Sequence, residues 1–277
     1  MALGGFDGAH VGHKTLFARA KAYGLPVGVM TITGGKGCPL FTVQERRNVF
    51  ARLGVDFALE LCFDEIREMS AEDFARRLAK ETSSVAFLCG EDFRFGYQAQ
   101  GTFETLHAYT GLPVERVELV KVAGEKVSAT KVKTLLSAGD TAGANALLGE
   151  PFFLLGTVEK DRGVGKSLGF PTANVRYPKE KFPLRKGVYE TRAEVDGKTY
   201  PAVTNFGARP TFLDESVWTE THLIGFDGDL YGREIRVEFL RYLRPIRKFD
   251  GADDLKAQLR ADVERARKGA NDGYFQN

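Results

Sequence analysis

The sequence has few cysteines, and their spacing suits neither a metal site nor a disulfide framework. Only Cys38, Cys62 and Cys89 occur in 277 residues, and no two of them stand two to four positions apart, as paired zinc ligands do. An odd number of cysteines in a chain of this size is typical of thiols kept reduced inside the cell. We therefore expect a cytoplasmic protein without disulfides.

The sequence also lacks a large excess of charge and a long apolar run. The formal net charge is only +2, and basic residues do not cluster with aromatic ones, so no nucleic acid partner is expected. No apolar stretch approaches the roughly 18 residues needed to cross a bilayer. Glycine appears within four residues of Met1, so we expect neither a membrane partner nor a signal peptide.

The patterns that are present indicate two domains. A chain of 277 residues is long for a single hydrophobic core. In the first half, residues 55–61 alternate with period two and residues 85–89 form a short apolar run, both typical of strands. Thr42, followed by Glu45 three positions later, has the pattern of a capping box and predicts that a helix starts at this point. Strands separated by helices indicate a parallel sheet, whose ligands bind beyond the carboxyl ends of the strands.

The second half has a different pattern from about residue 147. Strand-like segments follow one another without helices, and Asp196-Gly197 between two of them is a strong hairpin signal, because both turn positions favour positive φ. This pattern predicts an antiparallel barrel followed by a helix with one apolar face. We expect domains at residues 1–146 and 147–277, strands at residues 152–159, 188–195, 198–206, 217–226 and 233–243, and the helix face at Leu255, Leu259, Val263 and Ala266.

A glycine-rich segment at residues 163–174 has the composition of a phosphate-binding loop. Three glycines let the backbone approach phosphates closely, and a lysine, a hydroxyl and an amide accompany them. The segment is not a P-loop, because Lys160 stands where that pattern requires glycine. Gly169 and Pro171 would also interrupt the helix that must follow a P-loop.

This segment resembles the nucleotide loop of riboflavin kinases, which leads into the sequence Gly-Phe-Pro-Thr-Ala-Asn, found here at residues 169–174. Further motifs of that family follow in order: Asn-Phe-Gly-Ala-Arg-Pro-Thr-Phe at residues 205–212, Glu-Thr-His at residues 220–222, and Leu-Tyr-Gly at residues 230–232. The second domain therefore resembles a riboflavin kinase.

Two motifs in the first half resemble those of nucleotidyltransferases. Residues 5–13, Gly-Phe-Asp-Gly-Ala-His-Val-Gly-His, match the general signature, and residues 90–96, Gly-Glu-Asp-Phe-Arg-Phe-Gly, match the motif of flavin adenylyltransferases. Over nearly its whole length the chain is thus similar to the bacterial bifunctional riboflavin kinase and FMN adenylyltransferase (FAD synthetase) family. The resemblance implies a Rossmann-like nucleotidyltransferase domain and a β-barrel kinase domain. It also implies riboflavin, FMN and ATP as ligands, FMN and FAD as products, and Mg²⁺ as cofactor, in a monomer or weak homo-oligomer.

In the first domain, His10 and His13 are the candidate catalytic residues. Both stand at the predicted start of a helix, where two imidazoles can donate to the phosphates of ATP beside backbone amides. Adenylyl transfer needs positioning and charge neutralisation rather than a protein nucleophile. The resemblance adds Asp92 and Phe93 as flavin-binding residues, and the following as nucleotide-binding residues: Gly5, Asp7, Gly12, Ser128, Thr130, Lys131 and Lys133.

In the second domain, the resemblance implies that Thr172 and Asn174 hold Mg²⁺ and the ATP phosphates. Glu220 would be the general base that takes the proton from the riboflavin 5′-hydroxyl. Gly163, Gly165, Lys166 and Gly169 would complete the nucleotide loop, and Arg209 and Tyr231 would bind the flavin. Asp161 and Ile246 depart from the family pattern without removing a group that the chemistry needs.

Three hypotheses remain open: a bifunctional enzyme, a riboflavin kinase with an impaired or regulatory first domain, and a flavin-binding regulator without catalysis. The retained Glu220 argues against the regulator. His10 and His13 favour the bifunctional enzyme. The kinase-only hypothesis is favoured by residues 31–37, which differ from the family segment Phe-Glu-Pro-His-Pro, and by residues 128–133, where Ala129 replaces a serine and Lys133 an arginine that grips phosphate bidentately.

Overall fold

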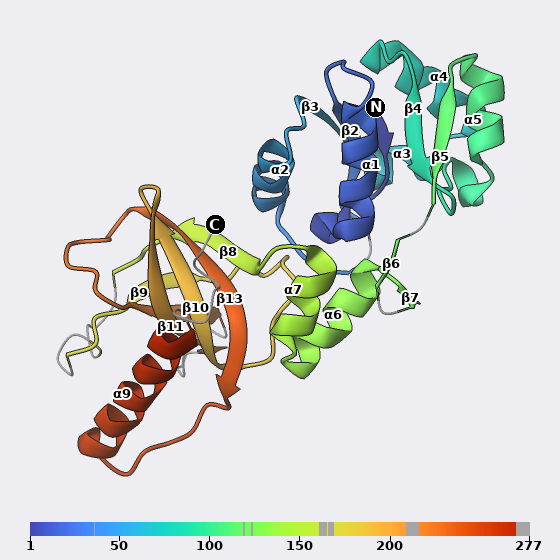
Figure 1. Cartoon of the computed structure of the whole chain (residues 1–277). Coiled ribbons are helices and arrows are strands. Elements are labelled where there is room, and N and C mark those ends of the chain that lie inside the picture. The colour runs from blue at the N-terminus through green and yellow to red at the C-terminus, as the bar shows by residue number, and fades with distance from the viewer. Residues whose placement is uncertain are drawn as a thin grey trace. The chain divides into compact units, whose positions relative to one another are not determined.

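The computed structural model describes residues 1–35, 37–118, 120–122, 124–160, 165, 169–208 and 216–269. The chain divides into two compact units, Met1–Ala129 and Thr130–Asn277. In Figure 1 the first unit runs from blue to green, and the second from green to red. In the described part of the chain, no helix is both long enough and apolar enough to cross a membrane.

The first unit is built on a parallel sheet of five strands in its described part, in the order β3-β2-β1-β4-β5. This order reverses direction between β1 and β4, where ligands bind in open α/β sheets. The strands are β1 (Ala2–Leu3), β2 (Gly28–Thr33), β3 (Phe57–Cys62), β4 (Phe87–Gly90) and β5 (Val114–Val117), joined by helices α1 (Val11–Lys21), α2 (Val43–Arg52), α3 (Phe63–Ile66), α4 (Ala71–Thr82) and α5 (Phe103–Thr110). The turns η1 (Asp7–Ala9) and η2 (Tyr97–Ala99) and the hairpin of β6 (Lys121–Val122) and β7 (Glu125–Lys126) complete this unit.

Local sequence signals explain where these helices begin. The Thr42 hydroxyl accepts a hydrogen bond from the Glu45 amide, and the Glu45 carboxylate accepts one from the Thr42 amide. This capping box satisfies donors that a helix start leaves without partners. The first sheet packs through apolar side chains that include Leu3, Met30 and Phe87, all at most 1% exposed.

The second unit is an antiparallel sheet of six described strands, in the order β8-β13-β10-β11-β12-β9. One isolated bridge joins its two edges, where the Glu159 amide donates to the Asn174 carbonyl at 2.8 Å. The sheet is therefore a nearly closed barrel. Its strands are β8 (Phe152–Thr157), β9 (Ala173–Arg176), β10 (Gly187–Val195), β11 (Lys198–Ala208), β12 (Val217–Leu223) and β13 (Glu234–Arg244).

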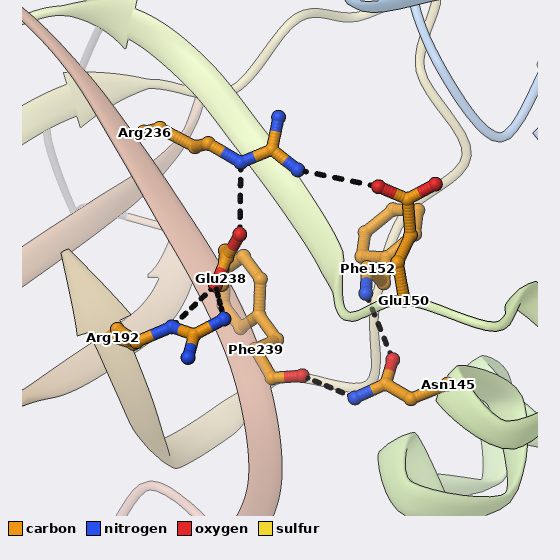
Figure 2. Close-up of polar contacts among 7 residues, drawn as sticks. All are labelled: Asn145, Glu150, Phe152, Arg192, Arg236, Glu238 and Phe239. Carbon is orange, nitrogen blue, oxygen red and sulfur yellow. Dashed lines mark hydrogen bonds and ion pairs between the residues drawn. The ribbon is translucent and has the colours of Figure 1, made fainter. Parts of the chain in front are cut away.

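Two helices precede the barrel, α6 (Ala129–Ala138) and α7 (Thr141–Leu148), and side chains of α7 form hydrogen bonds with its strands. Asn145 donates from Nδ2 to the Phe239 carbonyl at 2.8 Å and accepts from the Phe152 amide at 2.8 Å, so it joins α7 to both β13 and β8 (Figure 2). The Thr141 hydroxyl donates to the carbonyl of Leu240 at 3.2 Å. Leu240 lies at an irregularity in the β10–β13 register, so this hydroxyl contacts β13 where its regular pairing with β10 is interrupted.

An ion-pair network lies on the strands beside this helix (Figure 2). Arg236 donates to Glu238 at 2.9 Å, Arg192 donates to Glu238 at 2.6 Å, and Glu150 lies 3.6 Å from Arg236. Arg236 and Glu238 are each 5% exposed. Buried charges are normally paired, and this network joins Glu150, in the connection between α7 and β8, to strands β13 and β10.

Helix α9 (Ala252–Gly269) covers part of the outer face of the barrel. Val263 and Ala266 pack against Val188 and Val203 of β10 and β11. The fully buried Asp262 carboxylate receives a bidentate hydrogen bond from Arg244 of β13, at 3.1 and 2.7 Å. This pair fixes the helix on the strands.

The predicted fold is confirmed: a parallel α/β sheet is followed by an antiparallel near-barrel and a terminal helix. Among the described strands of the second unit, one was missed. Residues 173–176, assigned from sequence in part to the phosphate loop, form strand β9 at the edge of the barrel. Helices α6 and α7 belong to the second compact unit, whereas the predicted domain boundary at residue 147 would place them in the first domain.

Candidate active sites

A cleft of about 490 Å³ opens at the carboxyl ends of β1 and β4. The β1 strand leads into the Gly5–His13 motif and β4 into the Gly90–Gly96 motif, and the two strands are hydrogen-bonded neighbours. Sheet topology therefore brings together residues about 80 positions apart in sequence. The cleft is lined by eight of the predicted residues: Gly5, Asp7, His10, Gly12, His13, Asp92, Phe93 and Ser128.

The two histidines lie face to face at the start of α1. Their ring centroids are 3.6 Å apart with an interplanar angle of 14°, and the edge-on ring of Phe6 lies 5.0 Å from that of His13. A methyl group at Gly12 would lie 3.3 Å from the His10 ring. A side chain at this position would therefore press against the His10 imidazole and require the ring to shift.

Burial keeps both imidazoles neutral. It lowers the pKa of His10 to about 4, with the carboxylates of Asp7 and Asp92 opposing the shift and Lys126 adding to it. Burial, followed by the charge of His10, holds the pKa of His13 well below its usual value near 6.5. The Nδ1 atoms of both rings are buried and have no hydrogen-bond partner among the described residues. A neutral imidazole still carries one N–H to donate to a phosphate oxygen.

The flavin-side candidates lie across the same cleft. Asp92 forms an ion pair with Lys126 of β7 at 2.6 Å, and Phe93 stacks on Phe95 with ring centroids 5.7 Å apart. Lys126 was not predicted as a site residue, and a lone lysine in a short hairpin gives no sequence signal. The burial of Arg46 in α2 was also not predicted, although its spacing from Val49 and Phe50 puts it on the buried face of the helix.

The remaining predicted residues of the first nucleotide site belong to the second unit. Thr130, Lys131 and Lys133 follow Ser128 in helix α6. Thr130 and Lys131 are exposed, and the Lys133 ammonium lies 5.7 Å from the centre of the Phe182 ring. Their role in binding the ATP phosphates remains a prediction.

The second candidate site is a row of polar side chains across three strands. Asn174 of β9 is paired with Glu220 of β12, and Glu220 is paired with Asn205 of β11. Directly paired residues of antiparallel strands point to the same face of the sheet. Asn205 Nδ2 donates to Glu220 Oε2 at 3.3 Å. Strand register thus brings three residues from separate sequence motifs to one place.

A chain of buried hydroxyls secures that register on the opposite face. Thr204 shares hydrogen bonds with Thr191 at 2.8 Å and with Thr221 at 2.9 Å, and all three are at most 1% exposed. Thr204 precedes Asn205, and Thr221 follows Glu220. Sliding either strand would break this chain inside an apolar barrel, which costs free energy because buried polar groups need partners.

The described part of the nucleotide loop lies beside this row. Asn174 is 3% exposed and donates from Nδ2 to the Thr172 carbonyl at 3.2 Å. A Cβ at Gly165 would lie 2.5 Å from the Phe170 carbonyl and 3.4 Å from the Thr172 hydroxyl, so this glycine permits a close approach. Gly169 has a φ of +85°. Gly163, Lys166 and Arg209 lie outside the described residues.

The oxygen donors of this row suit Mg²⁺. A hydroxyl at Thr172, an amide at Asn174 and a carboxylate at Glu220 are hard ligands, and Mg²⁺ in nucleotide sites takes only one or two protein ligands beside phosphates and water. No cluster of three or more His, Cys, Asp or Glu side chains suited to a metal occurs among the residues that the structure describes.

A buried apolar cluster under α9 lies on the same face of the sheet as Glu220. Asn205 and Val203 lie on the same face of β11, and Val203 belongs to the cluster under α9. Phe170 packs against that cluster and lies edge-on to His222, whose Nδ1 is 2.9 Å from the Pro171 carbonyl. Tyr231, the predicted flavin-binding residue, is 44% exposed in the loop between β12 and β13.

Comparison with known proteins agrees with this division into two sites. The FAD synthetase family model matches residues 1–131, and the riboflavin kinase family model matches residues 148–270. The bifunctional riboflavin kinase/FMN adenylyltransferase of Pseudomonas fluorescens is 36% identical, over 96% of this chain and 91% of its own. That of Bacillus subtilis is 31% identical, over 100% and 92%. A crystal structure described as a macrolide-efflux protein from Streptococcus pneumoniae is 29% identical and superposes with a TM-score of 0.85, covering 96% of this chain and 93% of that one.

Proposed function

Because the chain belongs to the bifunctional riboflavin kinase/FMN adenylyltransferase family, we propose that it phosphorylates riboflavin to FMN and then adenylylates FMN to FAD. Both steps use ATP. The observation that carries the proposal is the Asn174–Glu220–Asn205 row, which sets a carboxylate between two amides. We place this activity in the cytoplasm, in a monomer or weak homo-oligomer.

In the kinase step, Glu220 accepts the proton of the riboflavin 5′-hydroxyl as the γ-phosphoryl group of ATP moves to that oxygen. Asn205 orients the carboxylate by donating to Oε2. Thr172 and Asn174 would hold Mg²⁺ and the ATP phosphates, and the ion, when bound, would neutralise phosphate charge. Gly163, Gly165, Lys166 and Gly169 approach the nucleotide, while Arg209 and Tyr231 contact the flavin. A pure binding protein would have no use for a general base here.

In the adenylylation step, a phosphate oxygen of FMN attacks the α-phosphorus of ATP, and pyrophosphate leaves. His10 and His13 donate hydrogen bonds to phosphate oxygens as charge develops on them. Gly5, Asp7 and Gly12 shape the loop that receives the nucleotide, with Ser128, Thr130, Lys131 and Lys133 as further phosphate contacts. Asp92 and Phe93 bind the flavin. Neutral imidazoles suit this role, since donation rather than proton abstraction is needed.

A kinase with an impaired first domain is the second candidate. It is favoured by the ion pair that Lys126 makes with Asp92, since this occupies a cation and a carboxylate of the cleft with each other. Ala129 and Lys133 favour it as well, because a lysine lacks the fork that grips phosphate bidentately. A phosphate group that draws Lys126 away from Asp92 would remove the first objection.

Separation of the products distinguishes these candidates. Purified protein is incubated with riboflavin, ATP and Mg²⁺, and FMN and FAD are resolved over time. Formation of FMN followed by FAD supports the bifunctional enzyme. FMN without FAD at millimolar ATP supports the kinase-only candidate, and tight flavin binding without either product supports a regulator.

A further inference from the structure

The loop between β1 and α1 has an unusual backbone. Phe6 and Ala9 have φ values of 48° and 42°, and Gly8 between them has 82°. The left-handed region is unfavourable for residues with a Cβ and persists only where surrounding contacts impose it. These residues line or adjoin the cleft at the β1–β4 junction, so the contacts that hold them also determine the shape of that cleft.

Two side chains hold this loop at the carbonyl of Gly5. The Thr31 hydroxyl of β2 donates to it at 3.0 Å, and Arg46 Nη1 of α2 donates to it at 3.3 Å. Arg46 Nη1 also donates to the Ile32 carbonyl at 3.0 Å. In a trans peptide the carbonyl and the following N–H point in opposite directions. Fixing the Gly5 carbonyl toward α2 therefore turns the Phe6 N–H away from α2.

Arg46 is an unusual arginine because its charge is buried without a counter-ion. It is 5% exposed, and no carboxylate among the described residues lies within ion-pair distance of it. The carboxylates of Asp7 and Glu60 act on it only from farther away, and Arg47 repels it. Its Nε atom is also buried without a hydrogen-bond partner among these residues. Buried charges in proteins are normally paired, because desolvating an unpaired one costs much free energy.

We propose that Arg46 is a positioning residue of the adenylylation site, whose guanidinium holds the Gly5 carbonyl and whose charge is balanced by the polyphosphate of bound ATP. This rests on the proposed adenylyltransferase function. Arg46 acts from behind the loop and does not line the cleft. In a partly buried site, electrostatic attraction does not require direct contact between the charges. ATP and pyrophosphate in the cleft are therefore the expected counter-ions of Arg46.

The test uses the full chain with Arg46→Met, Arg46→Lys and Thr31→Val. Arg47→Met is the matched control, because Arg47 is the next residue of the same helix but has an exposed side chain paired with Glu60. We measure the KM for ATP and the kcat of FAD formation, the KM for pyrophosphate in the reverse reaction, and pyrophosphate binding by calorimetry. FMN formation by the same protein reports on the second unit, and thermal unfolding of each variant reports on the folding of the first unit.

We expect Arg46→Met to raise both KM values and the dissociation constant of pyrophosphate by about tenfold or more, with FMN formation unchanged. Arg46→Lys should recover most of this loss, and Arg47→Met should match the unchanged protein. Thr31→Val removes a positioning contact without removing charge, so it should lower kcat and leave the KM for ATP nearly the same. If Arg46→Met does not fold, Arg46→Lys and Thr31→Val still separate charge from position.

Equal KM values for Arg46→Met and Arg47→Met would overturn the proposal, as would an Arg46→Lys variant no better than Arg46→Met. If the protein without substitutions binds pyrophosphate but makes no FAD, the adenylyltransferase function is contradicted. Calorimetry on the variants still decides the role of Arg46 in that case. An unchanged protein that neither makes FAD nor binds pyrophosphate overturns both.

Discussion

The two units build their candidate sites in different ways, although the proposed function asks both sites to place ATP beside a flavin. The first unit uses backbone: a loop in left-handed conformations, a helix start and two neutral imidazoles in a cleft. The second uses strand register: three side chains aligned across β9, β12 and β11, locked by hydroxyls on the other face. The first site therefore depends on the contacts that hold the backbone of its loop. The second depends on the pairing of its strands and on the carboxylate of Glu220.

The comparison predicts that the second site is most sensitive to a single functional group. Glu220→Gln keeps the size of the side chain and its contact with Asn205 but cannot accept a proton. FMN formation should fall by about 10²–10⁴-fold, with riboflavin and nucleotide binding little changed. Glu194→Gln on β10 is the control for charge. Near-normal turnover by the Glu220 variant would assign the base to another group or to water.

The first site should respond to loss of one imidazole while the second continues to work. His13→Ala removes a donor to the phosphate and the stacking partner of His10, so FAD formation should fall by about 10²–10³-fold. FMN formation, measured in the same reaction mixture, should stay unchanged. His107→Ala, on the surface of α5, controls for loss of a histidine. A parallel loss of FMN would mean that the two sites are not independent.

The boundary between the units can be tested by truncation. A chain starting at Thr130 keeps the hydrogen bond of Thr141 and the two of Asn145 to the barrel, and a chain starting at Leu147 loses all three. Figure 2 shows the two that Asn145 makes. The shorter chain should be less stable by on the order of 3 kcal/mol, at about 1 kcal/mol per hydrogen bond, and urea unfolding measures this difference. The sequence alone predicts that the chain from Leu147 suffices for FMN formation. FMN formation by the fragment from Leu147 would support that prediction, and equal stability of the two fragments would contradict the role of these hydrogen bonds.

The smallest expected effect is a pH dependence confined to the first unit. Because the pKa of His10 is lowered to about 4 from about 6.5 in an unfolded chain, the unfolded state binds the proton more readily. Stability from this group is therefore complete above about pH 6.5 and is lost as the pH falls toward 4. The first unit should lose thermal stability over this interval, and His10→Gln should weaken the dependence. An unchanged pH profile in that variant would contradict the assignment.

Periodicity and capping signals were enough to predict the fold, because both depend on neighbours in sequence. Thr42 and Glu45 form the expected capping box, and Asp196-Gly197 connects β10 and β11. Strand β9 was missed because it has only four residues and follows a proline, so its pairing with β12 rather than its own pattern defines it. A strand specified by a distant partner leaves little local signal.

The candidate sites were predictable to a different extent. The motifs identified Glu220 and the two histidines, but not the partners that orient them. Arg46 is charged, and charged residues are usually exposed, so only its position relative to Val49 and Phe50 hinted at burial. Lys126 approaches Asp92 through a hairpin whose position depends on tertiary structure. The spacing of apolar residues shows which face of a helix is buried but not which unit covers it. The sequence therefore could not place α6 and α7 in the second unit.

The barrel is closed at Glu159 and Asn174 by a single described bridge, whereas β10 and β11 share nine paired positions. The least protected part of the sheet therefore adjoins residues 160–172, where the nucleotide is expected to bind. In hydrogen exchange, the Glu159 amide should open by local fluctuation, while the amides of the β10–β11 ladder require more extensive unfolding. Nucleotide binding beside the Glu159–Asn174 bridge would slow exchange of the Glu159 amide. Part of the binding free energy would then be spent on ordering this part of the barrel.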